Sequence, residues 1–301
     1  MKTIFTIIIL FVSIALWAQT FESTNLPYTV PNVEFMPLRS RIDTAFQNNL
    51  REKLFQNRQW KELLKSKRMA IGVVDISDSS KIKFARINGN IMMYAASLPK
   101  IAILLATMDA IEKKEVIETE AIKEDLRLMI SKSDNHAATR MIDLLGYDKI
   151  EDVLTDPKYD LYDEEYGGGL WVGKRYAQSG DKNPDPLLGL SHAATVSQVC
   201  RFYYLMAFGR LVSHEKSLEM LDLMVEPKLH HKFVNSLDKL VPDAIVFRKS
   251  GTWKEYHSDS ILVWGPVWRR YILVGLIEDE NGEQILRNIV PVVEEILQSM
   301  K

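Results

Sequence analysis

Strand patterns occur near both ends of this chain but not in its middle, and this order restricts the possible folds. Five segments alternate or run apolar as β-strands do, and they are 69–76, 81–88, 244–250, 258–264 and 270–277. One antiparallel sheet built from both chain ends, flanked by helices and carrying an inserted all-helical lobe, satisfies this order. The sequence therefore predicts an α+β fold.

Apolar residues recur at helical spacing in the remaining elements. These segments are 40–65, 97–111, 119–130, 135–145, 194–208, 214–225 and 282–300. Residues 156–191 lack this periodicity, and a loop of that length is typical of a functional site or a disordered segment. We expect an α/β lobe of about 39–95 and 241–301, and a helical lobe of about 96–240, together forming one domain over 39–301.

Residues 1–18 have the features of a secretory signal peptide. Lys2 precedes an apolar run from Ile4 to Ala15, and processing is expected near Ala18. A membrane anchor is the alternative, but the run is short for a span. We expect residues 19–38 to be an extended lead-in and the mature chain to be secreted or periplasmic, with no stable membrane anchor.

Composition argues against several classes of function. Hydrophobic residues make up 47% and charged residues 26%, and the net charge is -2, an ordinary globular balance. No basic stripe is present, so no nucleic-acid partner is expected. Cys200 is the only cysteine, which excludes an intrachain disulfide and suggests a buried, inert thiol. The histidines lack metal-ligand spacing, so we expect no metal and no cofactor. Nothing indicates an obligate partner, and a monomer is expected.

Ser97 and Lys100 have the spacing of a nucleophile and its base. Pro99 is tolerated in a first helical turn, so a helix is expected to begin at about Ser97. Residues three apart share a helix face, which would place the Lys100 amine beside the Ser97 hydroxyl. Burial disfavours the charged form of a lysine, and such an amine can accept a proton from a serine.

Ser133 and Asn135 could serve the same reaction. They lie in Ser133-Asp134-Asn135, between two helical segments. A second serine can relay a proton, and an asparagine offers a donor and an acceptor to a substrate amide. The alternative role of this motif is to cap the following helix.

A third motif, Lys249-Ser250-Gly251-Thr252, ends a predicted strand. Lys249 can hold a substrate carboxylate, and Gly251 allows close approach of a ligand. The N–H of Thr252 could join that of Ser97 in an oxyanion hole. An ordinary strand end followed by a turn is the alternative.

The three motifs, in this order, resemble those of the class A β-lactamase-like serine hydrolases. The resemblance covers about residues 40–300 and implies the fold of that family, with a small-molecule substrate that is a β-lactam or a peptidoglycan-like amide. It implies that Ser97 is acylated with Lys100 as the activating amine. It also implies that Ser133 gives a proton to the leaving nitrogen and that Asn135 contacts the substrate's side-chain amide. Lys249 and Ser250 would anchor the substrate carboxylate.

The resemblance ends at the residue that positions the hydrolytic water. The family carries a glutamate in Glu-x-x-Leu-Asn on its long loop, and residues 156–191 contain no such motif. Glu165 is the nearest candidate, with a solvated loop acid as the alternative. His192 or His257 could instead position water. The Gly-rich and aromatic segment 167–176 is a candidate substrate-shaping loop.

Three functions follow from these motifs, which support acylation more fully than deacylation. The first is a secreted active-site-serine hydrolase that opens β-lactams or a related amide through a Ser97 acyl-enzyme. The second is a D-Ala-D-Ala peptidase or penicillin-binding protein with slow deacylation. The third is a non-catalytic binding protein on the same fold.

Overall fold

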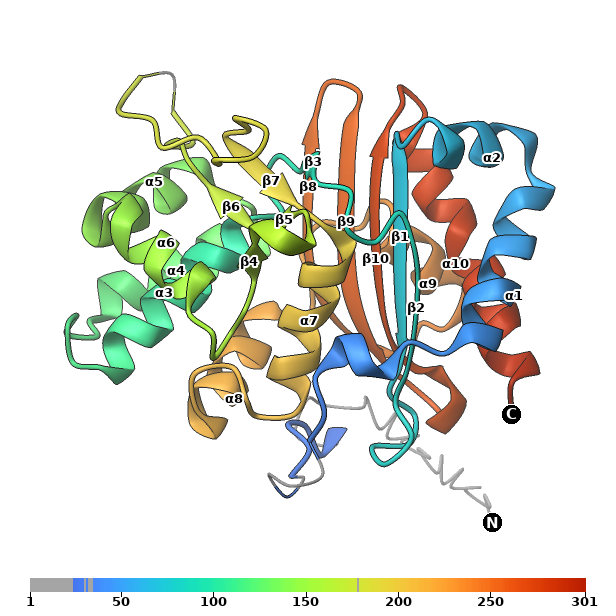
Figure 1. Ribbon diagram of the computed structural model, residues 1–301. Coiled ribbons are helices and arrows are strands. Elements are labelled where there is room, and N and C mark those ends of the chain that lie inside the picture. The colour runs from blue at the N-terminus through green and yellow to red at the C-terminus, as the bar shows by residue number, and fades with distance from the viewer. Residues whose placement is uncertain (1–23, 30, 32–34, 178) are drawn as a thin grey trace, which may run out of the picture.

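A computed structural model describes residues 24–29, 31, 35–177 and 179–301. The expected signal peptide and part of the lead-in lie outside the described residues. A five-stranded antiparallel sheet crosses the molecule and is flanked by helices on both faces (Figure 1). The α+β fold predicted from the order of elements is confirmed. In the described ranges, no helix has the length and apolar character needed to cross a membrane.

The central sheet joins the two ends of the chain. Its strands are β1 (Met69–Asp75), β2 (Lys83–Ile87), β8 (Ile245–Trp253), β9 (Tyr256–Trp264) and β10 (Arg270–Glu278). Their spatial order is β2-β1-β10-β9-β8, and every neighbouring pair is antiparallel. β1 lies beside β10, so the early and late strands meet inside the sheet. β8 is therefore an edge strand of this sheet.

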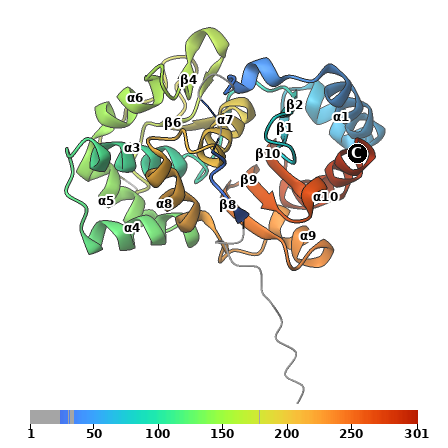
Figure 2. The ribbon, with the colours of Figure 1, turned by 90° about the horizontal axis from the view of Figure 1, so that it is seen from below.

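Helices from both chain ends cover one face of the sheet (Figure 2). They are α1 (Thr44–Gln56), α2 (Arg58–Lys65), α9 (Phe233–Leu240) and α10 (Gly282–Ser299), with η3 (Leu38–Arg41) before α1 and η5 (Val267–Arg269) before β10. The single helix expected over 40–65 is interrupted at Asn57, whose side chain accepts a hydrogen bond from Trp60 N at 3.1 Å. Asparagine favours such caps over helix interiors because its side chain competes for backbone groups. α9 packs on α10, so this layer includes residues that the sequence assigned to the helical lobe.

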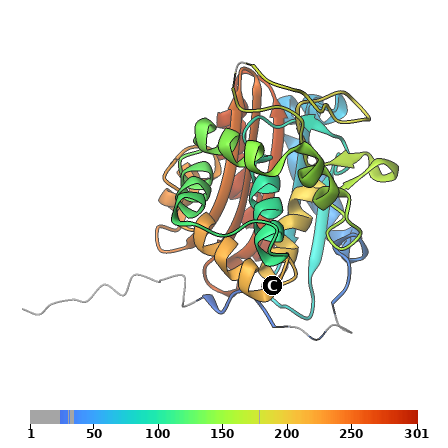
Figure 3. The same ribbon diagram turned by 90° about the vertical axis from the view of Figure 1, so that its left-hand side faces the viewer.

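The helical lobe covers the other face (Figure 3). Its helices are α3 (Lys100–Glu112), α4 (Glu120–Ser131), α5 (Asn135–Leu145), α6 (Tyr147–Thr155), α7 (Val196–Ala207) and α8 (His214–Met224). α6 was not predicted, because Gly146, with φ 75°, ends α5 and is followed directly by the next helix. α3 begins at Lys100 and not at Ser97, which lies in the turn that precedes the helix.

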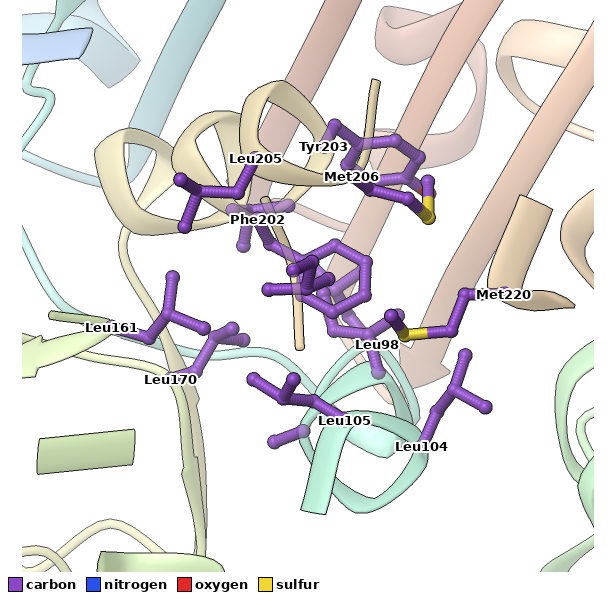
Figure 4. Close-up of a cluster of buried hydrophobic side chains, with 14 of the residues drawn as sticks. Leu98, Leu104, Leu105, Leu161, Leu170, Phe202, Tyr203, Leu205, Met206 and Met220 are labelled. Carbon is purple, nitrogen blue, oxygen red and sulfur yellow. The ribbon is translucent and has the colours of Figure 1, made fainter. Parts of the chain in front are cut away.

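A continuous apolar core joins α3 to α7 (Figure 4). Leu98 and Leu105 face Phe202 and Met206 within it. The residues of α3 are buried from its first position through Ala110, which makes it the central helix of the lobe. Cys200 of α7 packs closely on β1, and its burial raises the pKa of the thiol. This placement agrees with the inert core cysteine expected from the sequence.

The long segment that follows α6 is ordered by short strands and a buried aspartate. One small sheet consists of β3 (Met93–Tyr94), β6 (Trp171–Val172) and β7 (His192–Ala194). A second pair is formed by β4 (Tyr162–Asp163) and β5 (Gly168–Gly169), which are connected by η4 (Glu164–Tyr166). Asp185 accepts hydrogen bonds from the backbone N–H groups of Leu187, Leu188 and Leu190 and from the Tyr162 hydroxyl. The segment therefore holds a fixed set of side chains against the helical lobe.

A buried ion pair joins β8 to β9. Arg248 donates from Nε and Nη2 to the two carboxylate oxygens of Asp259, at 2.8 and 3.0 Å. Both side chains are buried, and Asp259 also accepts from the backbone N–H of Phe233 at 3.1 Å. Two charges can be buried together only when their hydrogen-bonding groups are matched in this way. The pair therefore connects the edge strand to its neighbour and to the start of α9.

Asp259→Ala is expected to lower the free energy of unfolding by about 3–5 kcal/mol, because it leaves the Arg248 guanidinium buried without its carboxylate. As a control, Glu295→Ala removes an exposed partner of Lys53 and should cost about 0–1 kcal/mol. Urea-induced unfolding of the purified variants measures both values. Equal losses would contradict a special role for the buried pair.

Candidate active site

Ser97 lies in the turn between β3 and α3, against the edge strand β8. The turn is closed by a hydrogen bond from Leu98 N to Ala95 O at 3.0 Å. A Cβ atom added at Gly251 would lie 2.5 Å from both Ser97 N and Ala95 O. Only glycine allows β8 to approach the turn this closely. The sequence predicted close approach of a ligand at Gly251. In the structure, the group that approaches Gly251 closely is the backbone that carries Ser97.

Lys100 is buried at the start of α3, and the Ser133 loop holds its amine. Nζ donates to the backbone oxygen of Ser133 at 2.6 Å and to Oδ1 of Asn135 at 2.7 Å. Burial lowers the pKa of Lys100 to about 7, with Asp134 acting in the opposite direction. A lysine with that pKa is partly neutral at neutral pH and can act as a base. Among the described residues, no hydrogen bond joins this amine to Ser97 Oγ, so proton transfer between them stays a prediction.

Lys249 reaches the same loop from β8. Its Nζ donates to Ser133 Oγ at 2.8 Å and to the Ser250 backbone oxygen at 2.8 Å. Burial, and next the nearby Lys100, lowers the pKa of Lys249 well below its usual range. Two buried amines therefore contact one serine, Lys100 at its carbonyl and Lys249 at its hydroxyl. This arrangement orients the Ser133 hydroxyl and places a proton donor next to it.

Asp134 and Asn135 have separate positions in the second motif. Asp134 caps α5 by accepting from Ala137 N at 2.7 Å, and this hydrogen bond lowers the pKa of its carboxyl. The capping role considered for the motif is therefore present at this residue. Asn135 begins α5 and uses its amide oxygen for Lys100. A substrate at this point would meet the amide donor of Asn135.

The end of β8 supplies backbone groups to the site. Ser258 Oγ, on β9, donates to Ala95 O at 2.8 Å and to Gly251 O at 3.2 Å, which ties the Ser97 turn to the strand. Thr252 follows Gly251 and is exposed. The N–H groups of Ser97 and Thr252 thus stay candidates for an oxyanion hole.

Neighbouring strand residues face opposite sides, so the Ser250 side chain lies on the other face from that of Lys249.

Tyr176, from the long segment, covers the Lys100 amine. Its ring centroid is 4.4 Å from Lys100 Nζ, and its hydroxyl donates to Ala96 O at 3.2 Å. The ring also packs on His192, with centroids 4.2 Å apart. The face of an aromatic ring attracts an ammonium group and excludes water from that side. The sequence indicated the segment 167–176, but nothing in it singled out Tyr176.

The structure does not bring Glu165 to the group formed by Ser97, Lys100 and Ser133. Glu165 is exposed in η4, where its N–H donates to Asp163 Oδ1 at 3.0 Å. The next residue, Tyr166, has its ring 4.8 Å from the Arg39 guanidinium, and Gly167 lies against the backbone of Asn90. These contacts hold η4 near η3 and the loop after β2. The solvated loop acid, considered as the alternative, describes Glu165 better than a water-positioning base.

The two histidines considered for water positioning differ in their placement. His257 packs against Gly282 at the start of α10, where an added Cβ would be 2.6 Å from its ring. It therefore faces away from the side that Ser258 shares with Ser97, and this placement does not favour a role for His257 in positioning water. His192 lies under Tyr176, and its ring nitrogens contact Lys174 O at 3.0 Å and Ser191 Oγ at 3.2 Å. Burial lowers the pKa of His192 to about 4, so this imidazole is a neutral support for the tyrosine.

The fold and the three converging motifs define a class A β-lactamase-like serine enzyme. A sequence model of the beta-lactamase enzyme family matches residues 117–297, which is more than half of the chain. The chain belongs to this family. No curated protein matches the sequence.

Several solved structures share the fold. A beta-lactamase from Sphaerobacter thermophilus DSM 20745 has a TM-score of 0.62 and 18% identity, covering 84% of this chain and 98% of that one. A mutant of PBP-A, solved as an acyl-enzyme complex with penicillin G, has a TM-score of 0.64 and 18% identity, with 86% and 98% covered. An ancestral class A beta-lactamase has a TM-score of 0.62 and 16% identity, with 79% and 98% covered. At these identities the likeness shows the fold alone.

Lys100 is expected to lose its proton near pH 7, because burial disfavours the ammonium form. Exposed Lys123, whose pKa is raised by Glu120, is the internal reference and should stay protonated through neutral pH. NMR titration of lysine labelled at Cε measures both, and Lys100→Met identifies the resonance by its loss. A Lys100 resonance that stays protonated up to pH 9 would contradict the assignment.

Proposed function

We propose that this chain is an active-site-serine hydrolase in which Ser97 is acylated by a β-lactam or a related amide. The observation that carries the proposal is the convergence of Lys100 and Lys249 on Ser133, next to the turn that bears Ser97. Membership of the beta-lactamase family supports the general class. Secretion through residues 1–18 is part of the same proposal.

Acylation starts with the neutral amine of Lys100. It takes the proton of Ser97 Oγ as this oxygen bonds to the carbonyl carbon, and the N–H groups of Ser97 and Thr252 stabilise the oxyanion. The amide C–N bond then breaks, and Ser133 Oγ gives its proton to the leaving nitrogen. The proton held on Lys100 then returns to Ser133, whose backbone carbonyl contacts the Lys100 amine and whose hydroxyl contacts Lys249. No net proton is consumed, and the acyl group remains on Ser97 as an ester.

Charge around the site favours an anionic substrate. Burial disfavours the charged form of Lys249, and a carboxylate on the substrate would favour and complement that charge. The amide donor of Asn135 faces a carbonyl of the substrate's side chain. β-Lactams and the D-Ala-D-Ala end of peptidoglycan stems both carry a carboxylate close to the amide that is opened. Both are therefore compatible with these groups.

Incubation with a β-lactam should add the mass of one opened β-lactam to each wild-type chain and none to Ser97→Ala. Ser131→Ala is the matched control, because the Ser131 hydroxyl donates to Arg127 O and should not affect the adduct. The acylation rate should rise as the pH increases through about 7, since only the neutral Lys100 amine accepts a proton. Loss of that base in Lys100→Met should slow acylation by about 10²-fold or more.

Intact-mass measurement over time gives the adduct and its rate. An adduct on Ser97→Ala would contradict the nucleophile assignment. A wild-type chain that shows neither adduct nor turnover with chromogenic β-lactams or D-Ala-D-Ala peptides would instead support a non-catalytic binding protein.

A second candidate is a penicillin-binding protein or D-Ala-D-Ala peptidase whose acyl-enzyme is released slowly. The observation that favours it is Tyr176, whose ring covers one side of the Lys100 amine and excludes water from that side. Glu165 lies elsewhere, and Asp134 is engaged in capping α5. An acyl-enzyme at Ser97 would then form faster than it is hydrolysed. Slow release of the acyl group supports this second candidate, and fast turnover of the β-lactam supports the first.

Tyr176→Leu is expected to accelerate deacylation by roughly 10-fold, or about 1.4 kcal/mol. The smaller side chain admits water beside Lys100. Tyr176→Phe is the matched control, because it keeps the ring over the amine and loses only the hydrogen bond to Ala96 O. The lifetime of the adduct after removal of free β-lactam measures the effect. Equal lifetimes in the two variants would contradict shielding by the ring.

A further inference from the structure

Lys232 is a buried lysine that the proposed mechanism does not use. Its side chain has no exposed surface, and its Nζ donates to Gly251 O at 2.6 Å and to Ser258 O at 2.9 Å. Gly251 and Ser258 are directly opposite each other in the β8–β9 register. The backbone of Lys232, with φ 53° and ψ −126°, is uncommon for a residue with a side chain. The fold thus accepts local strain and a buried charge to place this amine beside one residue pair.

A carboxylate does not neutralise the Lys232 amine. The nearby Asp259 is engaged at both oxygens by Arg248, and among the described residues no ion pair includes Lys232. A buried cation without a counter-ion depends on the dipoles that it contacts. Here those dipoles are the carbonyl groups of Gly251 and Ser258. The effect of the charge therefore falls on the peptide groups of these two residues.

The Gly251 carbonyl and the Thr252 N–H belong to one peptide group. In a trans peptide these two bonds point in opposite directions. Gly251 O faces β9, where it accepts from Ser258 Oγ and from Lys232. The Thr252 N–H therefore faces the free edge of β8, beside the turn that carries Ser97. Lys232 and the proposed oxyanion donor thus lie at opposite ends of the same peptide group.

We propose that Lys232 is a positioning residue that polarises the Gly251–Thr252 peptide and strengthens the Thr252 N–H as an oxyanion donor. Hydrogen-bonded groups in series polarise one another, and the low dielectric of the interior increases the effect. Lys232 does not touch the substrate. Its influence grows as charge develops on the oxyanion, so it acts on the transition state of acylation more than on binding. This inference rests on the proposed acylation of Ser97.

Infrared spectroscopy of the acyl-enzyme tests the inference. The stretching frequency of the Ser97 ester carbonyl falls as hydrogen bonds to its oxygen strengthen, and a ¹³C label on this carbonyl isolates the band. Lys232→Met should move the band to higher frequency and slow acylation by about 10-fold, with little change in affinity for the unreacted β-lactam. The effect should be smaller than the loss of a whole oxyanion donor, which costs about 10²–10³.

Two further variants separate polarisation from loss of structure. Lys232→Gln keeps a neutral donor near Gly251 O and should shift the band in the same direction; it carries the test if Lys232→Met does not fold. Lys216→Met removes another buried lysine, paired with Glu219 in α8, and should leave the band and the rate unchanged. A folded, acylated Lys232 variant with the wild-type band would overturn this inference and leave the proposed function standing. A wild-type chain without any adduct would overturn the proposed function, and the inference with it.

Discussion

The contact of two buried lysines with Ser133 is the interaction on which this site depends. Lys100 comes from the central helix of the helical lobe, and Lys249 comes from the edge strand of the sheet. Two desolvated amines near one another disfavour each other's charged form, and each of them contacts a different polar group of the same serine. The site therefore forms only when the lobe and the sheet are packed in one arrangement. The apolar core between α3 and α7 fixes that arrangement (Figure 4).

The parts of the site that the sequence predicted are those set by local spacing or by a motif. Ser97, Lys100, Ser133 and Lys249 could be found because each belongs to a short pattern with a chemical reason. The order of strand and helix patterns was sufficient to predict the α+β fold for the same reason. Element ends were less predictable: Asn57 divides a helix that apolar spacing alone makes continuous, and the Ser97 turn precedes α3.

The residues that the sequence could not indicate owe their positions to tertiary contacts. Tyr176 is far from Lys100 along the chain, and only the folding of the long segment brings its ring over the amine. His257 shows the opposite case, because closeness in sequence to the third motif did not reveal which face of β9 it occupies. Lys232 lies in a segment without periodicity or motif, and its role depends on the β8–β9 register. Local patterns carry no information on any of these contacts.

The sheet edge next to Ser97 also carries more positive than negative charge. Arg248, Lys249 and Lys232 are buried there, while Asp259 is the carboxylate that pairs with Arg248. Because Arg248 and Asp259 neutralise each other, the remaining basic groups are the two lysines, and burial lowers the pKa of both. Under the proposed function, Lys249 meets the carboxylate of the substrate, and Lys232 acts through the peptide that bears Thr252. One of these two basic groups would thus hold the substrate, and the other would stabilise the oxyanion through a backbone peptide.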